Sequence, residues 1–482
     1  MPEERLTLFV DLRTPRGVRA IECVRSLVAG ELGGRCRLEV VDVIESPERT
    51  ESERIVTTPT LVRTHAGKRR LVVGDMTRPE TVLTGLALEG LDLQVEQIGA
   101  LTELMVTFQW GDDAGHRLDA WVDRVTDLVR PPKGREIVRE YLLGLLRPGG
   151  SKSAKRMAHR GDPETRSARY QAMHHMVARA PWSDLDLMAR ARDRVLSAYC
   201  AEGSVAAWVI GERRIPRGGR SVVGLAPAPP TGLGRSMDGR SRDGDLEAMH
   251  QRAITLACVA ADGEAAPAGV RLFLPPSWCE HPARRQRAGI PTGVRHLEPW
   301  AIAVDLLDAA LADPNSRAPS APVCAAGDFV AAAAPDLAAA LRARGLGYAL
   351  QALPACLVTP VEEADLGVGA MPAHELARRA GGRGVIPLVD EDVWTAEEGR
   401  RPCLAVVEDP DGDPSYWLVG GPGSDDPHLL SEMPGHAATM FDDIAARAGL
   451  DAYNGRGWVG FHHHAALCVA AYAFLVSEDL EN

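Results

Sequence analysis

The chain has 482 residues, of which 45% are hydrophobic and 25% are charged, a balance that excludes a wholly disordered or collagen-like chain. At about 100–200 residues per domain, we expect two to four domains. The formal net charge of −12 is unevenly spread, because residues 1–90 are neutral, residues 130–220 carry +10 and residues 386–482 carry −14. The basic segment favours a polyanionic partner, and two solvated faces of opposite sign are an equally good interpretation.

The sequence also bears on compartment and metals. No run of about 18 apolar residues is apparent, which predicts that no segment spans a membrane. Residues 1–5 lack the basic and apolar regions of a signal peptide, so we expect a cytoplasmic protein. The nine cysteines include no C-x-x-C pair, which argues against a zinc ribbon or a dithiol redox site. We expect no cofactor and no bound metal.

The first 92 residues are predicted to form a small α/β domain. Alternating and β-branched residues predict strands, helical spacing of apolar residues predicts helices, and Pro15 suits a first helical turn. The strands are expected at 5–11, 37–43 and 70–74, and the helices at 15–31, 57–62 and 79–89. Their order favours a thioredoxin-like fold.

This segment resembles the KaiB clock-protein family and the KaiB-like modules of histidine kinases. The matching stretches are Leu8-Phe9-Val10, Thr14-Pro15, Val40-Val41-Asp42-Val43, Thr58-Pro59-Thr60-Leu61, Val73-Gly74-Asp75 and Val82-Leu83 with Gly85-Leu86. The resemblance implies a cis-proline at Pro59 and a protein-binding module, typically for an ATPase or kinase. We expect Thr58, Pro59, Arg69 and Arg70 to contact that partner. A role in assembly alone is the plainer alternative.

Residues 93–200 are predicted to be helical and basic. Apolar residues recur at helical spacing from Trp121 to Leu128 and from Ile137 to Leu146. The basic stretch 151–158 is compatible with a helix, and we expect Lys152, Lys155 and Arg156 to contact DNA phosphates.

Residues 201–482 are predicted to form an α/β core. Strands are expected at 204–210, 253–260, 269–274, 322–326 and 348–354, with a hairpin over 404–407 and 416–419. Helices are expected at 301–311, 337–344, 436–449 and 462–477. Residues 355–402 read as a polar, glycine-containing excursion from this core.

From about residue 100 onward the chain resembles the insertion-sequence DDE transposases, also called DDE-superfamily endonucleases. The stretches that carry the resemblance are Tyr141-Leu142 with Gly144-Leu145-Leu146, Ala180-Pro181-Trp182-Ser183, Ile215-Pro216-Arg217-Gly218-Gly219, Leu272-Phe273-Leu274-Pro275 with Ser277-Trp278, and Gly455-Arg456-Gly457-Trp458 with Gly460-Phe461-His462-His463-His464. The resemblance implies an RNase H-like core in which three carboxylates hold two divalent metals that activate the attacking oxygen and stabilise the leaving oxygen.

The three carboxylate positions of that family are occupied by other residues here. The first falls on Gly211, with Glu212 beside it, the second on Ala326 and the third on Ala438. Because two metals need converging negative oxygens, the sequence predicts a degenerate site that cannot cut DNA. It stays open whether Glu212, Asp328 and Asp442 or Asp443 replace the missing carboxylates as metal ligands.

The adjacent histidines His462, His463 and His464 are expected to pack rather than to bind metal, because neighbouring residues cannot all face one side of a helix. The same holds for His174 and His175.

Three functions remain open from the sequence. The first is a domesticated, non-cutting transposase relative that regulates through its KaiB-like domain and binds duplex DNA through residues 130–220, including Arg213, Arg214 and Arg217. The second is a protein–protein adaptor without DNA binding. The third is an enzyme that catalyses an unknown reaction in the cleft where the DDE transposases hold their metals. Fold analogy cannot choose between them.

Overall fold

The computed structural model describes most of the chain in two compact units, Met1–Ala100 and Leu101–Asn482. In the first unit it describes residues 4–10, 20–21, 23–25, 27–28, 36–53, 58–65 and 68–73, and the single positions 12, 55 and 76. In the second unit it describes residues 114–130, 132–147, 152–158, 166–202, 205–217, 222–227, 249–312, 320–361, 369–382, 384–389, 400–408 and 412–481. The predicted helix at 79–89 lies outside the described residues.

The first unit is built on a four-stranded sheet in the order β2-β1-β3-β4. Its strands are β1 (Glu4–Val10), β2 (Cys36–Asp42), β3 (Thr60–His65) and β4 (Lys68–Val73), with helix α2 at Pro47–Ser52. β1 pairs in parallel with β2, and the other pairs are antiparallel. Side chains alternate across β1, so Leu6 and Leu8 belong to one apolar cluster and Phe9 to another.

The turn before β3 corrects one prediction and confirms another. The predicted helix at 57–62 is wrong, because strand β3 begins at Thr60 and pairs with residues 5–9 of β1. The β-branched residues Thr60 and Val62 suit a pleated sheet better than a helix. The Thr58–Pro59 peptide bond is cis, as the resemblance implied.

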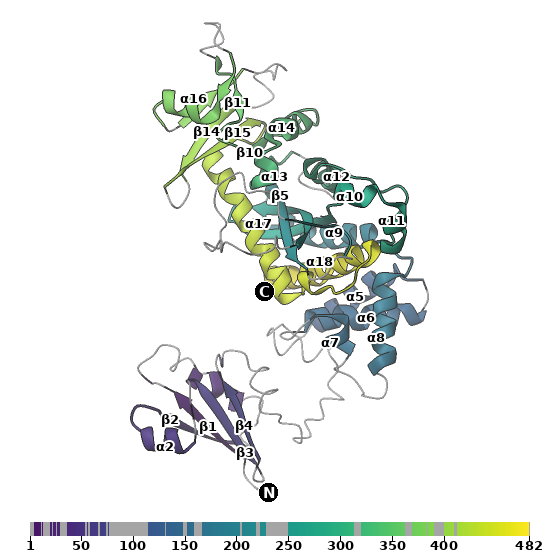
Figure 1. The fold of residues 1–482 in the computed structure, drawn as a ribbon, viewed down its shortest axis with the longest axis vertical. Coiled ribbons are helices and arrows are strands. Elements are labelled where there is room, and N and C mark those ends of the chain that lie inside the picture. Colours follow the sequence, from purple (N-terminus) through teal and green to yellow (C-terminus); the bar gives the residue numbers. More distant parts are fainter. Residues whose placement is uncertain are drawn as a thin grey trace. The chain divides into compact units, whose positions relative to one another are not determined.

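The second unit begins with helices that surround the last helix of the chain. These are α5 (Ala114–Thr126), α6 (Pro132–Leu146), α7 (Ala154–Ala158), α8 (Arg166–Ala178) and α9 (Asp184–Glu202). Helix α18 (Trp458–Glu481) packs against α5, α6, α8 and α9 on one side and against the sheet on the other (Figure 1).

Helix α18 bears on the expectation that no segment of the chain is long and apolar enough to span a membrane. Over Trp458–Glu478 it is long and apolar enough, by length and composition, to cross a membrane, although no such run was apparent in the sequence. Within this stretch 89% is buried inside the protein, as is typical of a core helix. The described residues therefore place it at the centre of the unit.

Within the described residues, nine strands form one mixed sheet in the order β13-β14-β15-β10-β9-β5-β7-β6, with β8 also paired to β7. The first strands in the chain are β5 (Val205–Pro216), β6 (Leu225–Pro227), β7 (Met249–Ala260), β8 (Ala265–Leu272), β9 (Val323–Ala325) and β10 (Tyr348–Ala352). β8, β7 and β5 are antiparallel, and β9 and β10 then continue parallel to β5. This is the pattern that an RNase H-like core predicts.

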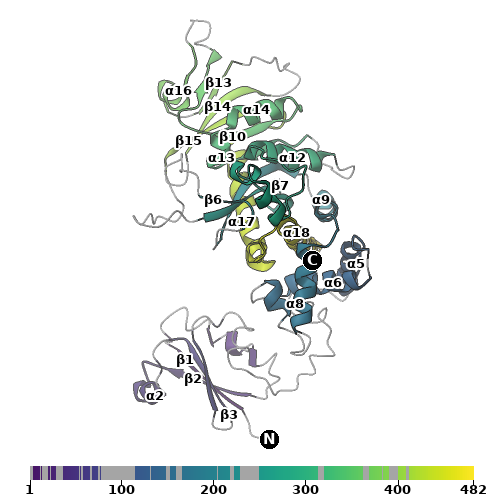
Figure 2. The ribbon, with the colours of Figure 1, turned by 45° about the vertical axis from the view of Figure 1, so that its right-hand side comes forward.

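Helices cover both faces of this sheet (Figures 1 and 2). On one face lie α12 (Pro299–Leu311), α13 (Asp328–Ala331) and α14 (Ala334–Arg342). On the other face, α17 (Pro427–Arg447) packs against β5, β8 and β9. The predicted helix at 436–449 is too short, because the Asp426 carboxylate caps the helix at the Leu429 amide and Pro434 lies inside it.

The predicted excursion over 355–402 is partly built into the sheet. Strands β11 (Leu357–Val358) and β12 (Met371–Pro372) pair, helix α16 (Ala373–Arg379) follows, and β13 (Gly384–Pro387) joins the sheet at β14 (Arg400–Glu408). The hairpin of β14 and β15 (Pro414–Gly421) is confirmed.

Candidate functional site

Two of the three positions where the resemblance places carboxylates lie side by side in the sheet, and the third lies on the covering helix α17. Ile210 of β5 pairs with Ala325 of β9, so Gly211 and Ala326 follow side by side. Arg213, two residues beyond Gly211, bonds to Asp442 of α17. Ala438 lies one helical turn before Asp442, and one turn spans about the length of two strand residues. Ala438 and Asp442 therefore lie on the same side of α17, where both are exposed.

Space at Gly211 is restricted. A Cβ atom added there would lie 2.9 Å from the Thr255 hydroxyl oxygen on β7. An aspartate at this position would require Thr255 to move, so the local packing is adapted to the absence of a side chain.

Glu212 points to the opposite face of the sheet, because successive strand residues alternate in direction. Its carboxylate is 7% exposed and lies between two arginines. Arg214 Nε donates to Glu212 Oε1 at 2.9 Å, and Arg252 Nε of β7 donates to Oε2 at 3.0 Å. Arg214 also reaches Asp328 of α13 at 3.2 Å. We call this set the buried network.

The α17 face of β5 carries a second set, which we call the outer network. Arg213 Nε and Nη2 donate to the two carboxylate oxygens of Asp451 at 2.8 and 2.6 Å, and Nη1 donates to Asp442 at 2.8 Å. Arg217 donates to the Gln251 side-chain oxygen at 2.7 Å and to the Asp451 carbonyl at 3.0 Å. Bidentate pairing of this kind is among the stronger charged contacts.

These contacts hold the arginines in their charged form. Burial by itself would lower the pKa of Arg213, but hydrogen bonds with Asp451 and Asp442 outweigh it and raise the pKa above its usual value. The pKa of Arg214 is raised in the same way by Glu212 and then Asp328, against the effect of burial. Burial lowers the pKa of Arg217.

The carboxylates considered as replacements for the missing metal ligands do not converge on one point. Glu212 and Asp328 share Arg214 on one face of the sheet, whereas Asp442 meets Arg213 on the other. Asp443 turns to α18, where it accepts from the Tyr472 hydroxyl at 2.9 Å. No group of three His, Cys, Asp or Glu side chains in the described part of the chain is arranged to hold a metal ion.

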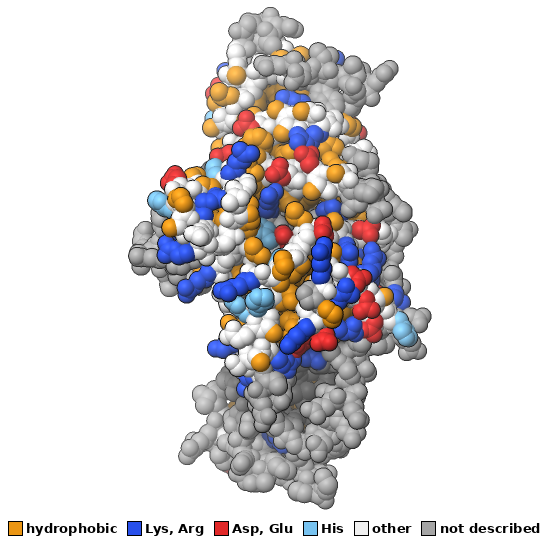
Figure 3. Space-filling model, turned by 90° about the vertical axis from the view of Figure 1, so that its right-hand side faces the viewer, with side chains coloured by type: hydrophobic (Ala, Val, Ile, Leu, Met, Phe, Trp, Pro, Cys, Tyr) orange, Lys and Arg blue, Asp and Glu red, His pale blue; other side chains and the backbone are white. Residues whose placement is uncertain are grey.

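The six residues predicted to contact DNA lie in different surroundings. Lys152 is buried, and its ammonium bonds to the Arg147 carbonyl. Lys155 and Arg156 are exposed on α7. Arg213, Arg214 and Arg217 belong to the two networks. Figure 3 shows the face that carries α12, where basic and acidic side chains are interspersed rather than gathered in one basic stripe.

The residues predicted to bind a partner all lie in the first unit. Thr58 and Pro59 form the cis turn before β3, and Arg69 and Arg70 lie on β4, paired with Thr64 and Arg63 of β3. Their binding role stays a prediction.

The three adjacent histidines of α18 each bond to a different segment. His462 accepts from the Leu272 amide at 3.2 Å. His463 lies between the Val177 and Trp182 carbonyls and stacks on Trp182. His464 bonds to the Tyr141 hydroxyl and the Gly449 carbonyl. These contacts account for all three rings as links between α18 and its neighbours.

The sheet, with its paired β5 and β9 and its covering helix α17, defines the class of protein as an α/β chain with a DDE-type core. A family model described as DDE superfamily endonuclease matches residues 129–396, and a model described as KaiB domain matches residues 7–88. The chain belongs to the DDE superfamily endonuclease family, with an N-terminal unit of the KaiB family. The α/β multidomain fold class predicted from the sequence is confirmed.

Curated relatives match the N-terminal part. The circadian clock oscillator protein KaiB of Thermostichus vulcanus is 36% identical over 98 residues, which are 20% of this chain and 86% of that protein. The KaiB of Prochlorococcus marinus strain MIT 9313 is 34% identical over 20% of this chain and 80% of its own length. The circadian clock protein KaiB3 of a Synechocystis strain is 33% identical over 19% and 92%.

Three members of the networks were not predicted from the sequence: Arg252, Gln251 and Asp451. For Arg252 a signal existed, because a charged residue beside a run of buried positions signals a buried partner. Asp451 differs in this respect. Its partner Arg213 lies 238 positions away, so the sequence held no local signal for the pair.

Proposed function

We propose that this chain is a regulatory protein whose DDE core no longer cleaves DNA and whose KaiB-like unit binds a partner protein. The observation that carries the proposal is the arginine pairing of the acidic side chains that remain near the old site. Glu212, Asp328 and Asp442 each have a guanidinium partner. A two-metal mechanism needs these oxygens free and convergent.

The charge balance supports the same conclusion. In an active site of this kind, metal cations neutralise converging carboxylates. Here Gly211, Ala326 and Ala438 contribute no carboxylate, and arginines provide the positive charge that the remaining acids require. Metal binding would have to displace those arginines from short, charge-assisted hydrogen bonds.

The test is a cleavage and binding assay with the full chain. Labelled duplex DNA would be incubated with and without Mg²⁺ at low and moderate salt, alongside an active DDE endonuclease as positive control. We expect no nicking under any condition. Magnesium-dependent nicking that depends on Glu212 or Asp442 would overturn the proposal.

Binding of duplex DNA without cleavage is a second candidate, favoured by the exposure of Lys155 and Arg156 on α7. Several other basic residues of the helical segment pair with acidic side chains, such as Arg135 with Asp127 and Arg139 with Asp119. If these helices contact phosphates, the double variant K155Q/R156Q should weaken binding and reduce its salt dependence. The matched control is R378Q/R379Q, which removes two adjacent arginines from helix α16.

The partner-binding half of the proposal can be tested separately. The full chain and its R69E/R70E variant would be compared for co-elution with a KaiB-type partner ATPase or kinase. Loss of co-elution in the variant alone supports binding through β4. Unchanged co-elution would move the contact to another part of the first unit.

A further inference from the structure

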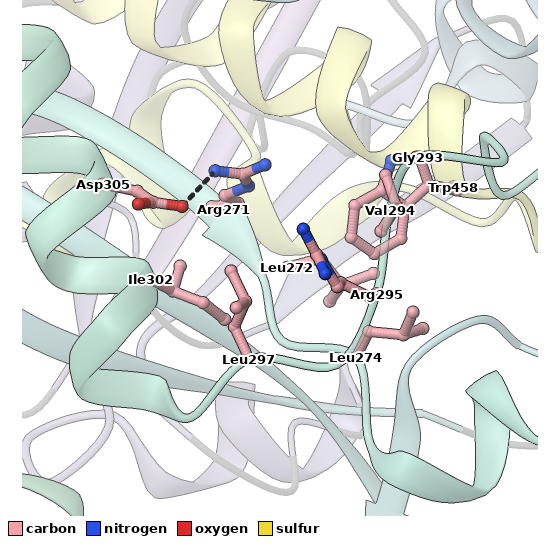
Figure 4. Close-up of a pocket in the computed structure, with 10 residues that line it drawn as sticks. All are labelled: Arg271, Leu272, Leu274, Gly293, Val294, Arg295, Leu297, Ile302, Asp305 and Trp458. Atoms are coloured by element: carbon pink, nitrogen blue, oxygen red, sulfur yellow. Dashed lines mark hydrogen bonds and ion pairs between the residues drawn. The ribbon is translucent and has the colours of Figure 1, made fainter.

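A cavity of about 350 Å³ opens at the end of strand β8, away from both arginine networks (Figure 4). It lies between the first turns of α12 and α18, with the loop at 293–297 as its third side. Strand β7 separates it from β5. The cavity shares no residue with the buried or outer network.

Apolar side chains that are largely buried form the floor of the cavity, and polar groups make up the larger part of its exposed lining. Leu272 and Leu274 come from the end of β8 and the chain that follows it, Leu297 and Ile302 come from the entry to α12 and from its first turn, and Trp458 begins α18. The His462 ring, which accepts from the Leu272 amide, joins the two sides. This bond fixes the floor, so the cavity is formed before any ligand arrives.

Two arginines stand over this floor. Arg271 and Arg295 extend their guanidinium groups toward the space above the apolar side chains (Figure 4). Arg271 makes a 3.4 Å contact with Asp305, and both side chains are partly exposed. Arg295 has no ion pair or hydrogen bond with any residue that the structure describes. The formal charge of the three groups is therefore +1.

We propose that this cavity binds a small organic anion, in which one phosphate or carboxylate group is attached to a planar apolar body. The anionic group would meet Arg295 and Arg271, whose forked donors match phosphate and carboxylate oxygens. The apolar body would cover Leu297, Ile302 and the Trp458 ring. Asp305 disfavours a second anionic group beside the first.

The size and charge of the cavity narrow the ligand further. Small-molecule sites usually measure roughly 300–1,000 Å³, so this one suits a ligand of the size of a nucleoside monophosphate or smaller. A bare inorganic anion would leave the floor in contact with water. A neutral nucleoside would leave Arg295 without a partner. Both should bind more weakly than a molecule with the two parts joined.

The first experiment is calorimetric titration of the full chain with four probes: phenyl phosphate, adenosine 5′-monophosphate, inorganic phosphate and adenosine. We expect the two organic phosphates to bind about tenfold or more tightly than either part alone, which is a difference of about 1.4 kcal/mol. Benzoate distinguishes a carboxylate from a phosphate source. Equal, weak binding of inorganic and organic phosphates would show a surface ion effect and overturn the proposal.

Variants locate the site. Arg295→Gln should weaken binding of the tighter organic phosphate by about tenfold, and Arg287→Gln on helix α11 (Pro282–Ala288) is the control that removes one nearby charge outside the cavity. Gly293→Trp adds a large ring to a residue that lines the cavity, at a position where an added Cβ meets no atom within 4 Å, and should weaken binding. Retained affinity in both cavity variants would place any binding elsewhere. Neither result depends on whether the chain cuts DNA.

Discussion

On one face of β5 the Glu212 carboxylate is buried between Arg214 and Arg252, whereas on the other face Asp442 meets Arg213 with 76% of its side chain exposed. The chemistry of the two contacts is the same, and the distances are similar. Their surroundings differ, because the buried network is largely removed from water.

The difference shows which ion pairs are expected to stabilise the fold and which are expected to contribute little to stability. An exposed ion pair contributes little, because water and salt screen both charges. A buried pair is costly to break, because the remaining charge is left without a partner. The buried network therefore holds β5, β7 and α13 together, while the outer network is expected to depend mainly on Asp451.

The largest effect is expected for Glu212→Ala. Removing this carboxylate takes the acidic partner from the buried Arg252 and leaves Arg214 with Asp328 alone, which should lower the free energy of unfolding by about 3–5 kcal/mol. Urea denaturation of the full chain measures it. Glu212→Gln, which keeps an oxygen acceptor, should cost less. A loss below about 1 kcal/mol would mean that water solvates this network.

A pH dependence is expected on the α18 side of the sheet. Burial lowers the pKa of His464 to about 4, below its ordinary value of about 6.5. Between these two values the unfolded chain binds the proton and the folded chain does not, so stability falls as the pH falls from about 6.5 to about 4. The loss reaches up to about 3 kcal/mol at about 1.4 kcal/mol per unit.

Unfolding free energies measured across that pH range test this assignment. The slope should decrease in His464→Gln, whereas His428→Gln, which replaces an exposed histidine of α17, should keep the slope of the natural chain. Equal slopes in all three proteins would assign the pH dependence to other groups.

An intermediate effect is expected for Asp451→Asn. The substitution removes the charge from a bidentate contact with Arg213, in which Asp451 is 34% exposed. We expect a loss of about 1–2 kcal/mol, measured by urea denaturation. A loss as large as that of Glu212→Ala would mean that the two faces of β5 are equally shielded from water.

The smallest effect is expected for Asp442→Asn. Its contact with Arg213 is 2.8 Å long, but exposure limits the pair to at most about 1 kcal/mol. Raising the salt concentration should remove what remains of the difference between this variant and the natural chain. A persistent difference at 1 M salt would contradict the screening argument.

The elements that could be predicted are those whose pattern is local. The strands at β5, β9 and β10 are runs of apolar residues long enough to be recognised, and β14 and β15 were found as a hairpin. Helix α17 was predicted to begin at residue 436, whereas the Asp426 cap sets its start at Pro427 and Pro434 lies inside it. The turn at residues 57–62 was misassigned because pairing with β1 decides its conformation.

The candidate site also has one part that could be predicted from the sequence and one part that could not. That Gly211, Ala326 and Ala438 carry no carboxylate is a property of the sequence alone. Arginines as partners of the remaining acids could not be predicted, because Arg213 and Asp451, or Glu212 and Arg252, are far apart in the chain. Nor could the cavity at Arg295, whose walls come from segments before α12, from α12 itself and from the start of α18.

The sequence by itself determined the KaiB-like motifs, the DDE-type motifs and the residue types at the three positions where the resemblance places carboxylates, because these depend on residues read one after another. Only the tertiary structure decided that Glu212 and Asp442 lie on opposite faces of β5, that guanidinium groups neutralise them, and that Arg295 has no such partner among the described residues. Burial and charge pairing depend on which segments fold against each other, and a carboxylate is a metal ligand, a structural ion or a solvated group according to those neighbours.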